Sequence, residues 1–432
     1  MRSRPGLWVL MCTWSLLVAC GPEALEVPAN PEPEETGEVS TPPTTPEPEE
    51  GPVAEAPPPQ GNPQQPIPVE PPPVTEPGNP PPAPTPAPVF QPAFHQALRW
   101  SKSVSSLTTF RMRVPVGKAG ERLRVTFSAG DGSLTLHKAT VARAGANGAL
   151  ASAPVTLTFN GSQGVSASSR KLVTSDPVVF PVGFREELAI SFEVSGALGV
   201  SAINAFPGSF SRSGAYSTRV DALGGQASQQ AIGIATVDVE ATAGRAFVAI
   251  GDSITEGYID TYNDVRNSWP SLVEQQLRVP VVNAAVSGQG FWGALQNLDR
   301  EVLAVSGATD CLVLLGTNDL TSLSVADLQT RMTTLLTRLK PFCRVWVSTL
   351  LPKEKTNYGT YDQVKRDRVA FNTWIRSQTL AEVIDLEAVT RSPSSVHLFI
   401  DGLEVDGIHP SAQGHSVMAA EVVRVLRARG GL

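Results

Sequence analysis

A serine at the end of an apolar run is the first candidate for chemistry in this chain of 432 residues. Ser253 follows residues 247–250 and the dipeptide Gly251-Asp252. If the run is a buried strand and a helix begins at Ser253, its hydroxyl and backbone N–H face open space, because the first amides of a helix lack intrahelical partners. Such a serine could act as a nucleophile. The alternative is a serine that only caps the helix, which is a common role.

A carboxylate and an imidazole stand three positions apart near the C-terminus. Asp406 precedes His409, and Gly407 between them would allow the chain to fold back so that the two side chains meet. A serine hydroxyl is a weak nucleophile until a base removes its proton, and a carboxylate fixes the imidazole tautomer and stabilises its charged form. The pair therefore suits the activation of a serine. The alternative is a loop histidine whose hydrogen bonds are satisfied by its neighbours.

Two further residues follow apolar runs and could donate hydrogen bonds to an anion. Gly288 comes after residues 279–286, and Asn318 comes after residues 312–315. A glycine lets the backbone amide come close to a substrate, and an asparagine can donate from its side-chain amide. The alternatives are a plain turn glycine and an Asx turn.

These candidates lie in a region where apolar runs alternate with helical patterns. From about residue 245 the alternation predicts an α/β fold for residues 243–432, with a three-layer, doubly wound, parallel five-stranded sheet that is flavodoxin-like. Ligands bind at the carboxyl ends of the strands in such sheets, so we expect the candidate stretches to meet there. The predicted strands are 247–250, 279–286, 312–315, 345–347 and 383–386, and the predicted helices are 269–277, a segment after 293, 325–339, 364–375 and 411–427.

Residues 94–242 show a different pattern. Short runs alternate apolar and polar residues, which is the period of a half-buried strand. The glycine-rich segment 130–132 and the Asn-Gly pair 160–161 are turn signals between such runs. We therefore predict an all-β sandwich domain that precedes the α/β domain.

The segment 20–93 is rich in proline and glutamate. Most of the 38 prolines of the chain lie there, and it contains neither lysine nor arginine. Such a composition cannot bury enough apolar surface to offset the entropy lost on ordering, so we expect a disordered tether. The tether either sets a distance from a membrane or cell wall or has no selected length, and its sequence does not decide between these.

Residues 1–19 resemble the signal peptide of a bacterial lipoprotein. Arg2 and Arg4 give a charged start, and the apolar run 7–19 is too short for a comfortable transmembrane helix. On this resemblance Cys20 becomes the first mature residue and carries lipid, which would anchor the protein outside the cytoplasm, at an outer membrane or cell surface. The alternative is an ordinary signal peptide that is cleaved near Ala19.

Two more cysteines, Cys311 and Cys343, each open an apolar run. If the two predicted strands are parallel neighbours, the sulfurs could meet, and export favours oxidation. The alternative is a pair of buried free thiols.

The charge of the chain argues against a nucleic-acid partner. The formal net charge is -7, and without the acidic tether the remainder is close to neutral, so no basic face is expected. The sequence also shows no metal-ligand cluster and no phosphate-binding loop, so we expect no metal or cofactor. It does not fix the oligomeric state.

The blocks around Ser253, Gly288, Asn318 and the Asp406/His409 pair together resemble the SGNH (GDSL-type) hydrolase superfamily. With the β-rich segment upstream, the chain is similar to the secreted esterases of this superfamily that carry an N-terminal β-sandwich. The resemblance implies an ester hydrolase in which Ser253 is the nucleophile, His409 the general base and Asp406 the group that orients His409.

The resemblance also implies an oxyanion hole. Its donors would be the backbone N–H groups of Ser253 and Gly288 and the side-chain amide of Asn318, each of which can contribute about 3 kcal/mol to the transition state. The second block of the family often has Gly-Asn, whereas this chain has Gly288-Gln289.

The substrate is less defined. We expect a carbohydrate O-acetyl esterase, with a lipase or lysophospholipase on the same triad as one alternative and a non-catalytic carbohydrate-binding surface lipoprotein as the other. Tyr258, Asp260, Phe291 and Trp292 follow the candidate blocks and are expected to line the cleft. Ordinary packing is the alternative for each of the four.

Overall fold

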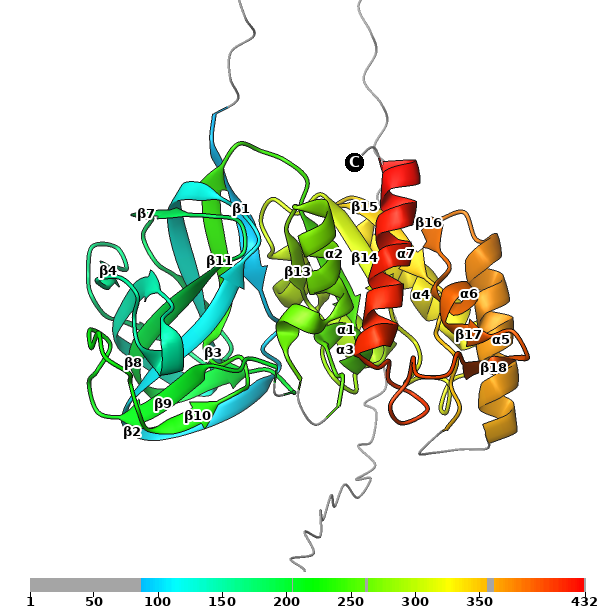
Figure 1. Cartoon of the computed structure of the whole chain (residues 1–432), viewed down its shortest axis with the longest axis horizontal. Coiled ribbons are helices and arrows are strands. Elements are labelled where there is room, and N and C mark those ends of the chain that lie inside the picture. Colours follow the sequence, from blue (N-terminus) through cyan, green and yellow to red (C-terminus); the bar gives the residue numbers. More distant parts are fainter. Residues whose placement is uncertain (1–86, 204, 261–262, 356–360, 431–432) are drawn as a thin grey trace, which may run out of the picture. The chain divides into compact units, whose positions relative to one another are not determined.

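The computed structural model describes residues 87–432, except 204, 261–262, 356–360 and 431–432. The predicted signal peptide, Cys20 and most of the predicted tether lie outside the described residues. The first strand, β1 (Val89–His95), begins before the end of the segment 20–93, so the last residues of that segment belong to a folded β domain. An α/β domain follows the β domain along the chain (Figure 1).

The α/β domain is built on a sheet of five parallel strands, which confirms the predicted doubly wound fold. The strand order is β13-β12-β14-β15-β16, so the chain enters the sheet at β12, adds β13 on one side of it, and then adds β14, β15 and β16 on the other side. Strands β12 and β14 are buried along their whole length, as is typical of parallel sheets, and this is why they occur as continuous apolar runs. The strands are β12 (Phe247–Gly251), β13 (Val281–Asn283), β14 (Asp310–Leu314), β15 (Arg344–Ser348) and β16 (Glu382–Ile384).

Helices cover both faces of this sheet. On one face α2 and α7 pack against each other, and on the other α3, α4 and α5 follow one another (Figure 1). None of the helices in the described part of the chain is long and apolar enough to cross a membrane. The helices are α1 (Ser253–Glu256), α2 (Trp269–Leu277), α3 (Phe291–Leu298), α4 (Val325–Leu339), α5 (Tyr361–Ser377), α6 (Leu386–Thr390) and α7 (Ala412–Gly430), with short 3-10 turns at Ala146–Gly148 and Val265–Asn267 and a π-helical turn at Asp299–Leu303.

The β domain is one antiparallel sheet that folds over its own core as a half-barrel or sandwich, as predicted. Its main path is β1-β11-β3-β8-β2-β9-β10, and four short strands pair with β3 off this path. The longest strand, β3, pairs with β11, β6 and β7 over its first half and with β8, β4 and β5 over its second half. The strands are β2 (Trp100–Val116), β3 (Gly120–Arg143), β4 (Val155–Leu157), β5 (Val165–Ala167), β6 (Leu172–Thr174), β7 (Val178–Val182), β8 (Glu186–Val200), β9 (Ser209–Ser213), β10 (Gln226–Ser228) and β11 (Ile234–Ala241); a hairpin of β17 (Arg391–Ser392) and β18 (Ser395–Phe399) lies in the α/β domain.

One of the two turn predictions in the β domain was wrong. Residues 130–132 lie inside β3, at the register shift between Ala129 and Leu134. A Cβ at Gly130 would stand 2.6 Å from the carbonyl oxygen of Leu198, so the glycine serves a close approach of two strands rather than a turn. The turn at 160–161 is confirmed, with φ values of 50° and 79°.

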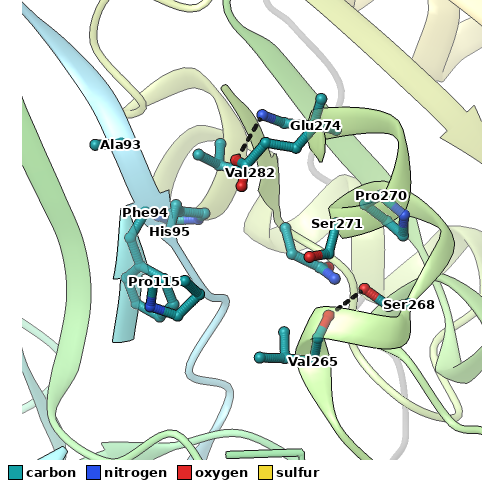
Figure 2. A pocket seen from close by; sticks show the side chains of 12 residues that line it. Ala93, Phe94, His95, Pro115, Val265, Ser268, Pro270, Ser271, Glu274 and Val282 are labelled. Atoms are coloured by element: carbon teal, nitrogen blue, oxygen red, sulfur yellow. Dashed lines mark hydrogen bonds between the residues drawn. The ribbon is translucent and has the colours of Figure 1, made fainter. Parts of the chain in front are cut away.

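The β domain is joined to the α/β domain along β1 and β13. The N–H of Ala97 donates to the carbonyl oxygen of Asn283 over 3.2 Å, which extends the pairing of the parallel sheet by one bridge. A small cavity of about 40 Å³ lies beside this junction, and Figure 2 shows His95 of β1 and Glu274 of α2 among its lining residues. Burial lowers the pKa of His95 to about 4, so this histidine is neutral and structural.

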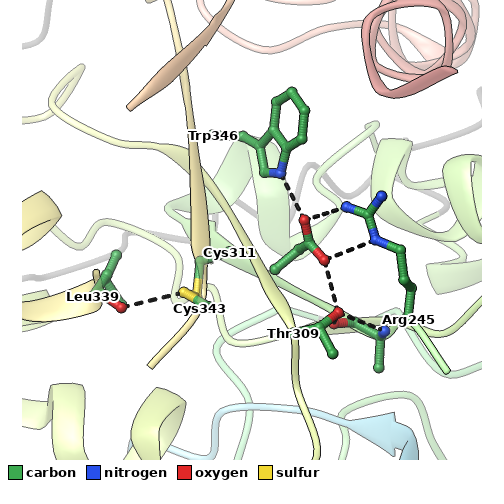
Figure 3. The surroundings of a disulfide bond; sticks show 8 residues. Arg245, Thr309, Cys311, Leu339, Cys343 and Trp346 are labelled. Atoms are coloured by element: carbon green, nitrogen blue, oxygen red, sulfur yellow. Dashed lines mark hydrogen bonds and ion pairs between the residues drawn. A yellow bond between two sulfur atoms is a disulfide. The ribbon is translucent and has the colours of Figure 1, made fainter. Parts of the chain in front are cut away.

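Cys311 and Cys343 are bonded in the structure, with their Cα atoms 5.9 Å apart (Figure 3). Cys311 is the second residue of β14 and Cys343 immediately precedes β15, and these strands are parallel neighbours. The disulfide therefore lies at the amino ends of the strands, away from the edge where ligands bind. Beside it, the buried carboxylate of Asp310 accepts from Arg245 and from the indole N–H of Trp346.

Candidate active site

Ser253 is positioned by the sharp passage from β12 into α1. The side chain of Asp252 accepts a hydrogen bond from the N–H of Ile254 over 3.0 Å, so α1 begins at Ser253. Gly251 allows this tight turn, because a Cβ there would lie 2.3 Å from the hydroxyl oxygen of Thr255. The Ser253 hydroxyl oxygen lies 2.8 Å from Nε2 of His409, within hydrogen-bonding range of a base.

His409 is held by Asp406 through two kinds of contact. Nδ1 of His409 lies 2.8 Å from Oδ2 of Asp406, while Oδ1 accepts the backbone N–H groups of His409 and Ile408 over 2.8 and 3.0 Å. Partial burial alone would raise the pKa of Asp406, but the hydrogen bonds from His409 and Ile408 outweigh burial and hold it below its usual value. An ionised Asp406 keeps the proton on Nδ1, which leaves Nε2 free to accept the Ser253 proton.

The three predicted anion donors stand at the carboxyl ends of β12, β13 and β14. Gly288 has a φ of +76°, a left-handed conformation that favours glycine. The side-chain amide of Asn318 donates to the carbonyl oxygen of Gln289 over 3.0 Å, which links the second and third blocks. Among the described residues, no acceptor takes the backbone N–H of Ser253 or of Gly288, so both amides are available to a ligand.

A buried charge cluster lies beneath these loops. Lys353 donates to the carbonyl oxygen of Thr317 over 2.8 Å, and Asp319 accepts the N–H of Phe291 over 3.1 Å. Burial raises the pKa of Asp252 to about 7 and that of Asp319 to about 6, although the charge of Lys353 opposes both shifts. The cluster therefore holds the carbonyl group just before Asn318 and ties the side chain just after it to the first residue of α3.

Tyr258 packs directly on the catalytic candidate His409. The centroids of the two rings are 4.3 Å apart. The carbonyl oxygen of Tyr258 accepts from Nε2 of His415 over 3.1 Å, and Nδ1 of His415 accepts the N–H of Trp269 over 3.1 Å. His415 was not predicted from the sequence, since nothing there distinguishes it from an ordinary helical histidine. Burial lowers its pKa to about 4, so it stays neutral and supports Tyr258.

The other predictions for the cleft had mixed outcomes. The prediction for Phe291 was wrong, because its ring is 0% exposed and packs edge-on against Phe371. Trp292, the next residue on α3, is 69% exposed and remains a candidate contact for substrate. The backbone N–H of Asp260 donates to the side chain of Asn263 over 3.1 Å, and the charge of Asp260 contributes to a raised pKa of Tyr258 after burial and Asp406.

Across the described residues, no three His, Cys, Asp or Glu side chains gather in a way that could hold a metal ion. The site offers a hydroxyl, an imidazole and a carboxylate in series, beside the backbone N–H groups of Ser253 and Gly288.

Residues 249–417 match the GDSL-like Lipase/Acylhydrolase family. The C-terminal half of the chain is therefore a GDSL (SGNH) hydrolase domain, and a β-rich region precedes it. As an acylhydrolase of this kind, the protein is an ester hydrolase. No curated protein matches the chain significantly.

The following solved structures each cover less than half of this chain. A lipase/acylhydrolase from Enterococcus faecalis is 25% identical, with 43% of this chain and 97% of that chain covered and a TM-score of 0.36. The acetylxylan esterase Axe2 from Geobacillus stearothermophilus is 17% identical, with 43% and 94% covered and a TM-score of 0.35. The psychrotrophic esterase EstA from a Pseudoalteromonas species is 21% identical, with 44% and 100% covered and a TM-score of 0.36.

Proposed function

We propose that the protein hydrolyses esters through a covalent acyl-enzyme on Ser253, with His409 as general base and Asp406 as the residue that orients it. The observation that carries this proposal is the unbroken series of contacts, 2.8 Å from Ser253 to His409 and 2.8 Å from His409 to Asp406. A serine in this arrangement gains the reactivity that an isolated hydroxyl lacks.

The reaction then runs in two halves. Ser253 Oγ attacks the ester carbonyl while its proton moves to Nε2 of His409, and the negative charge on the carbonyl oxygen is stabilised by the N–H groups of Ser253 and Gly288 and the amide of Asn318. The C–O bond to the alcohol breaks as His409 returns the proton to the leaving oxygen. His409 then takes a proton from water, which attacks the acyl carbon; as the bond to Ser253 Oγ breaks, His409 gives that proton to Oγ, and the acid leaves.

The test is the turnover of p-nitrophenyl acetate by Ser253→Ala beside a control, Ser306→Ala, which changes an exposed serine in the loop before β14. We expect kcat to fall by at least about 10⁴-fold in the first variant, as for loss of a triad nucleophile, and to stay unchanged in the second. Undiminished turnover by Ser253→Ala would reject the proposal.

For the substrate class, we propose O-acetyl groups on carbohydrate. Trp292 supports this, because a largely exposed indole at the start of α3, four residues after Gly288, offers a flat surface on which a sugar ring can stack. Trp292→Ala is expected to raise KM for an acetylated oligosaccharide about tenfold or more, the equivalent of about 1.4 kcal/mol, and to leave KM for p-nitrophenyl acetate unchanged. Equal effects on both substrates would contradict the assignment.

A lipase or lysophospholipase is the second candidate, favoured by a different observation. Leu398, Ile400 and Val405 are all more than a third exposed, and Val405 is the residue next to Asp406. Exposed apolar side chains near a site can receive an acyl chain. Comparing kcat/KM for acetyl and long-chain esters of one alcohol separates the two candidates, since the carbohydrate esterase should favour acetyl.

We further propose that the protein acts outside the cytoplasm, lipid-anchored to a bacterial membrane at Cys20. The disulfide between Cys311 and Cys343 supports export, because disulfides persist in oxidising compartments. Radioactive palmitate should label the protein in the bacterium that makes it, and Cys20→Ala should abolish the label. Unlabelled wild-type protein, or labelled Cys20→Ala, would contradict the anchor.

A further inference from the structure

Arg99, a residue of the β domain, reaches into the α/β domain. It lies between β1 and β2, and its guanidinium donates to Glu301 from Nε over 2.7 Å and from Nη2 over 2.5 Å. Nη2 also donates to the side-chain oxygen of Gln289 over 2.9 Å. The side chains of Arg99 and Glu301 are 17% and 6% exposed, so this two-pronged ion pair is largely shielded from water and its geometry is fixed.

Through Gln289, this contact helps to position the loop that carries Gly288, beside Ser253. Arginine only donates hydrogen bonds, so the side-chain oxygen of Gln289 must face Arg99 and its amide nitrogen must face the other way. That nitrogen donates to the carbonyl oxygen of Gly251 over 2.6 Å. The backbone oxygen of Gln289 accepts from Asn318. One side chain therefore connects the turn before Ser253 and the loop that carries Gly288.

The opposite side of Gly288 is held in the same manner. The N–H of Ser287 donates to Oε2 of the buried Glu256 over 2.5 Å. Oε1 of the same carboxylate accepts the N–H groups of Ala202 and Ile203, which follow β8 in the β domain, over 3.0 and 3.3 Å. Gly288 itself has little packing to locate it, since no atom lies within 4 Å of where its Cβ would stand.

We propose that the β domain is a working part of the active site, and that Arg99 is a positioning residue that acts through Gln289 to aim the amides of Gly288 and Asn318 at the oxyanion. This inference rests on the proposed function. It assigns a role to the β domain beyond covering one edge of the α/β domain. A misplacement of reacting groups by about 1 Å costs on the order of a hundredfold in rate, so loss of this contact should be measurable.

The experiment compares two variants that differ only at Arg99. Removing Arg99 alone would leave the carboxylate of Glu301 buried without a partner, which destabilises a fold strongly. We therefore compare Glu301→Gln, which keeps Arg99 beside Gln289, with Arg99→Met in the same Glu301→Gln background. On p-nitrophenyl acetate, Glu301→Gln should keep kcat within about threefold of wild type, and the double variant should lose about ten- to a hundredfold in kcat with little change in KM, as for an interaction made in the transition state.

A double-mutant comparison tests whether Arg99 acts through Gln289. Gln289→Ala should lower kcat by a smaller factor in the Arg99→Met variant than in the protein that keeps Arg99, because residues that act as one unit are not additive. Arg300→Met is the control for the junction, since Arg300 donates to the carbonyl oxygen of Leu98 over 3.0 Å and to Ser128, and not to Gln289. Arg300→Met should leave kcat within about twofold of wild type, and its thermal midpoint should fall because the hydrogen bonds of Arg300 to the β domain are lost.

Three results would overturn the inference: unchanged kcat after loss of Arg99, an equal loss in Arg300→Met, or additive effects of Arg99→Met and Gln289→Ala. If Arg99→Met does not fold, Arg99→Lys decides, because a lysine keeps the charge but cannot hold Glu301 and Gln289 with one planar fork. The Arg99→Lys variant must then show the same selective loss in kcat, and a wild-type kcat would refute the positioning role of Arg99. A failure of the proposed function looks different, since Ser253→Ala would then be as active as wild type.

Discussion

Replacing Asp406 with asparagine should impair catalysis while leaving the loop intact. The asparagine can keep an oxygen where Oδ1 of Asp406 now accepts the N–H groups of His409 and Ile408, and its NH₂ group must then face Nδ1 of His409. Nδ1 becomes an acceptor, the ring proton moves to Nε2, and Nε2 can no longer take the proton of Ser253. In a fully buried triad this wrong tautomer costs about 10⁴ in kcat.

The loss here should be smaller, because the side chain of Asp406 is 40% exposed. Water can accept from Nδ1 in its place, so part of the population keeps the productive tautomer, and we expect kcat to fall by about 10²- to 10³-fold. The assay is p-nitrophenyl acetate hydrolysis at neutral pH. Asp401→Asn, which changes an exposed carboxylate in the same loop, is the control and should leave kcat unchanged.

Stability provides a second readout for Asp406→Asn. The hydrogen bonds that lower the pKa of Asp406 make the folded state favour its ionised form. Its contribution to stability is therefore present above the unfolded pKa of about 3.9 and is lost as pH falls through the lower folded pKa. The variant should have a lower thermal midpoint than wild type at pH 7, and the difference should shrink towards pH 3. A kcat within about threefold of wild type would refute the tautomer argument, whatever the stability.

Three further predictions concern the disulfide, the oxyanion loop and a buried acid. Replacing Cys311 and Cys343 with alanine should lower the free energy of unfolding by about 3–4 kcal/mol in urea titrations, which is the chain-entropy value for a bond that spans 32 residues. The same change should leave kcat unchanged, because the bond lies at the amino ends of the strands, and a large loss of kcat would contradict this expectation. In Gly288→Ala the added Cβ meets no neighbour, but alanine must adopt a φ of +76°. The variant should therefore lose about 1–2 kcal/mol of stability, or shift the loop and lose kcat, and wild-type stability together with wild-type kcat would show that no strain arises. Burial raises the pKa of Glu256 to about 7, so its contribution to stability is greatest below its unfolded pKa of about 4.3 and is lost as pH rises towards 8. Glu256→Gln should therefore flatten the fall of the thermal midpoint between pH 5 and 8, and an unchanged slope would refute the raised pKa of Glu256.

Much of the fold could be predicted from the spacing of apolar residues along the sequence. Parallel strands that are buried on both faces must be apolar throughout, so β12 and β14 were predictable as short runs, and α4 was predicted at its observed bounds of Val325–Leu339. The segment 130–132 shows the limit of this reasoning. Glycines signal a turn and a close approach of strands equally well, and only the packing of β3 against Leu198 distinguishes them.

The residues of the candidate site were predictable for a related reason. Ser253, Gly288 and Asn318 each follow an apolar run, and the carboxyl ends of parallel strands meet at one edge. The Arg99–Gln289 contact was not predictable, because the two residues are 190 positions apart and belong to different domains. Phe291 and Trp292 show a second limit, since neighbours in the first turn of a helix point about 100° apart and the sequence does not say which one faces the core.

Covalent labelling of Ser253 measures whether His409 activates its hydroxyl. A fluorophosphonate reacts when an activated serine oxygen attacks phosphorus and displaces fluoride, and peptide mass mapping locates the adduct. We expect one adduct on the wild-type protein, at Ser253, and loss of at least about 99% of the labelling rate in His409→Ala, as for removal of a triad base. An unlabelled wild-type protein, an adduct at another serine, or full labelling of His409→Ala would show that His409 does not activate Ser253.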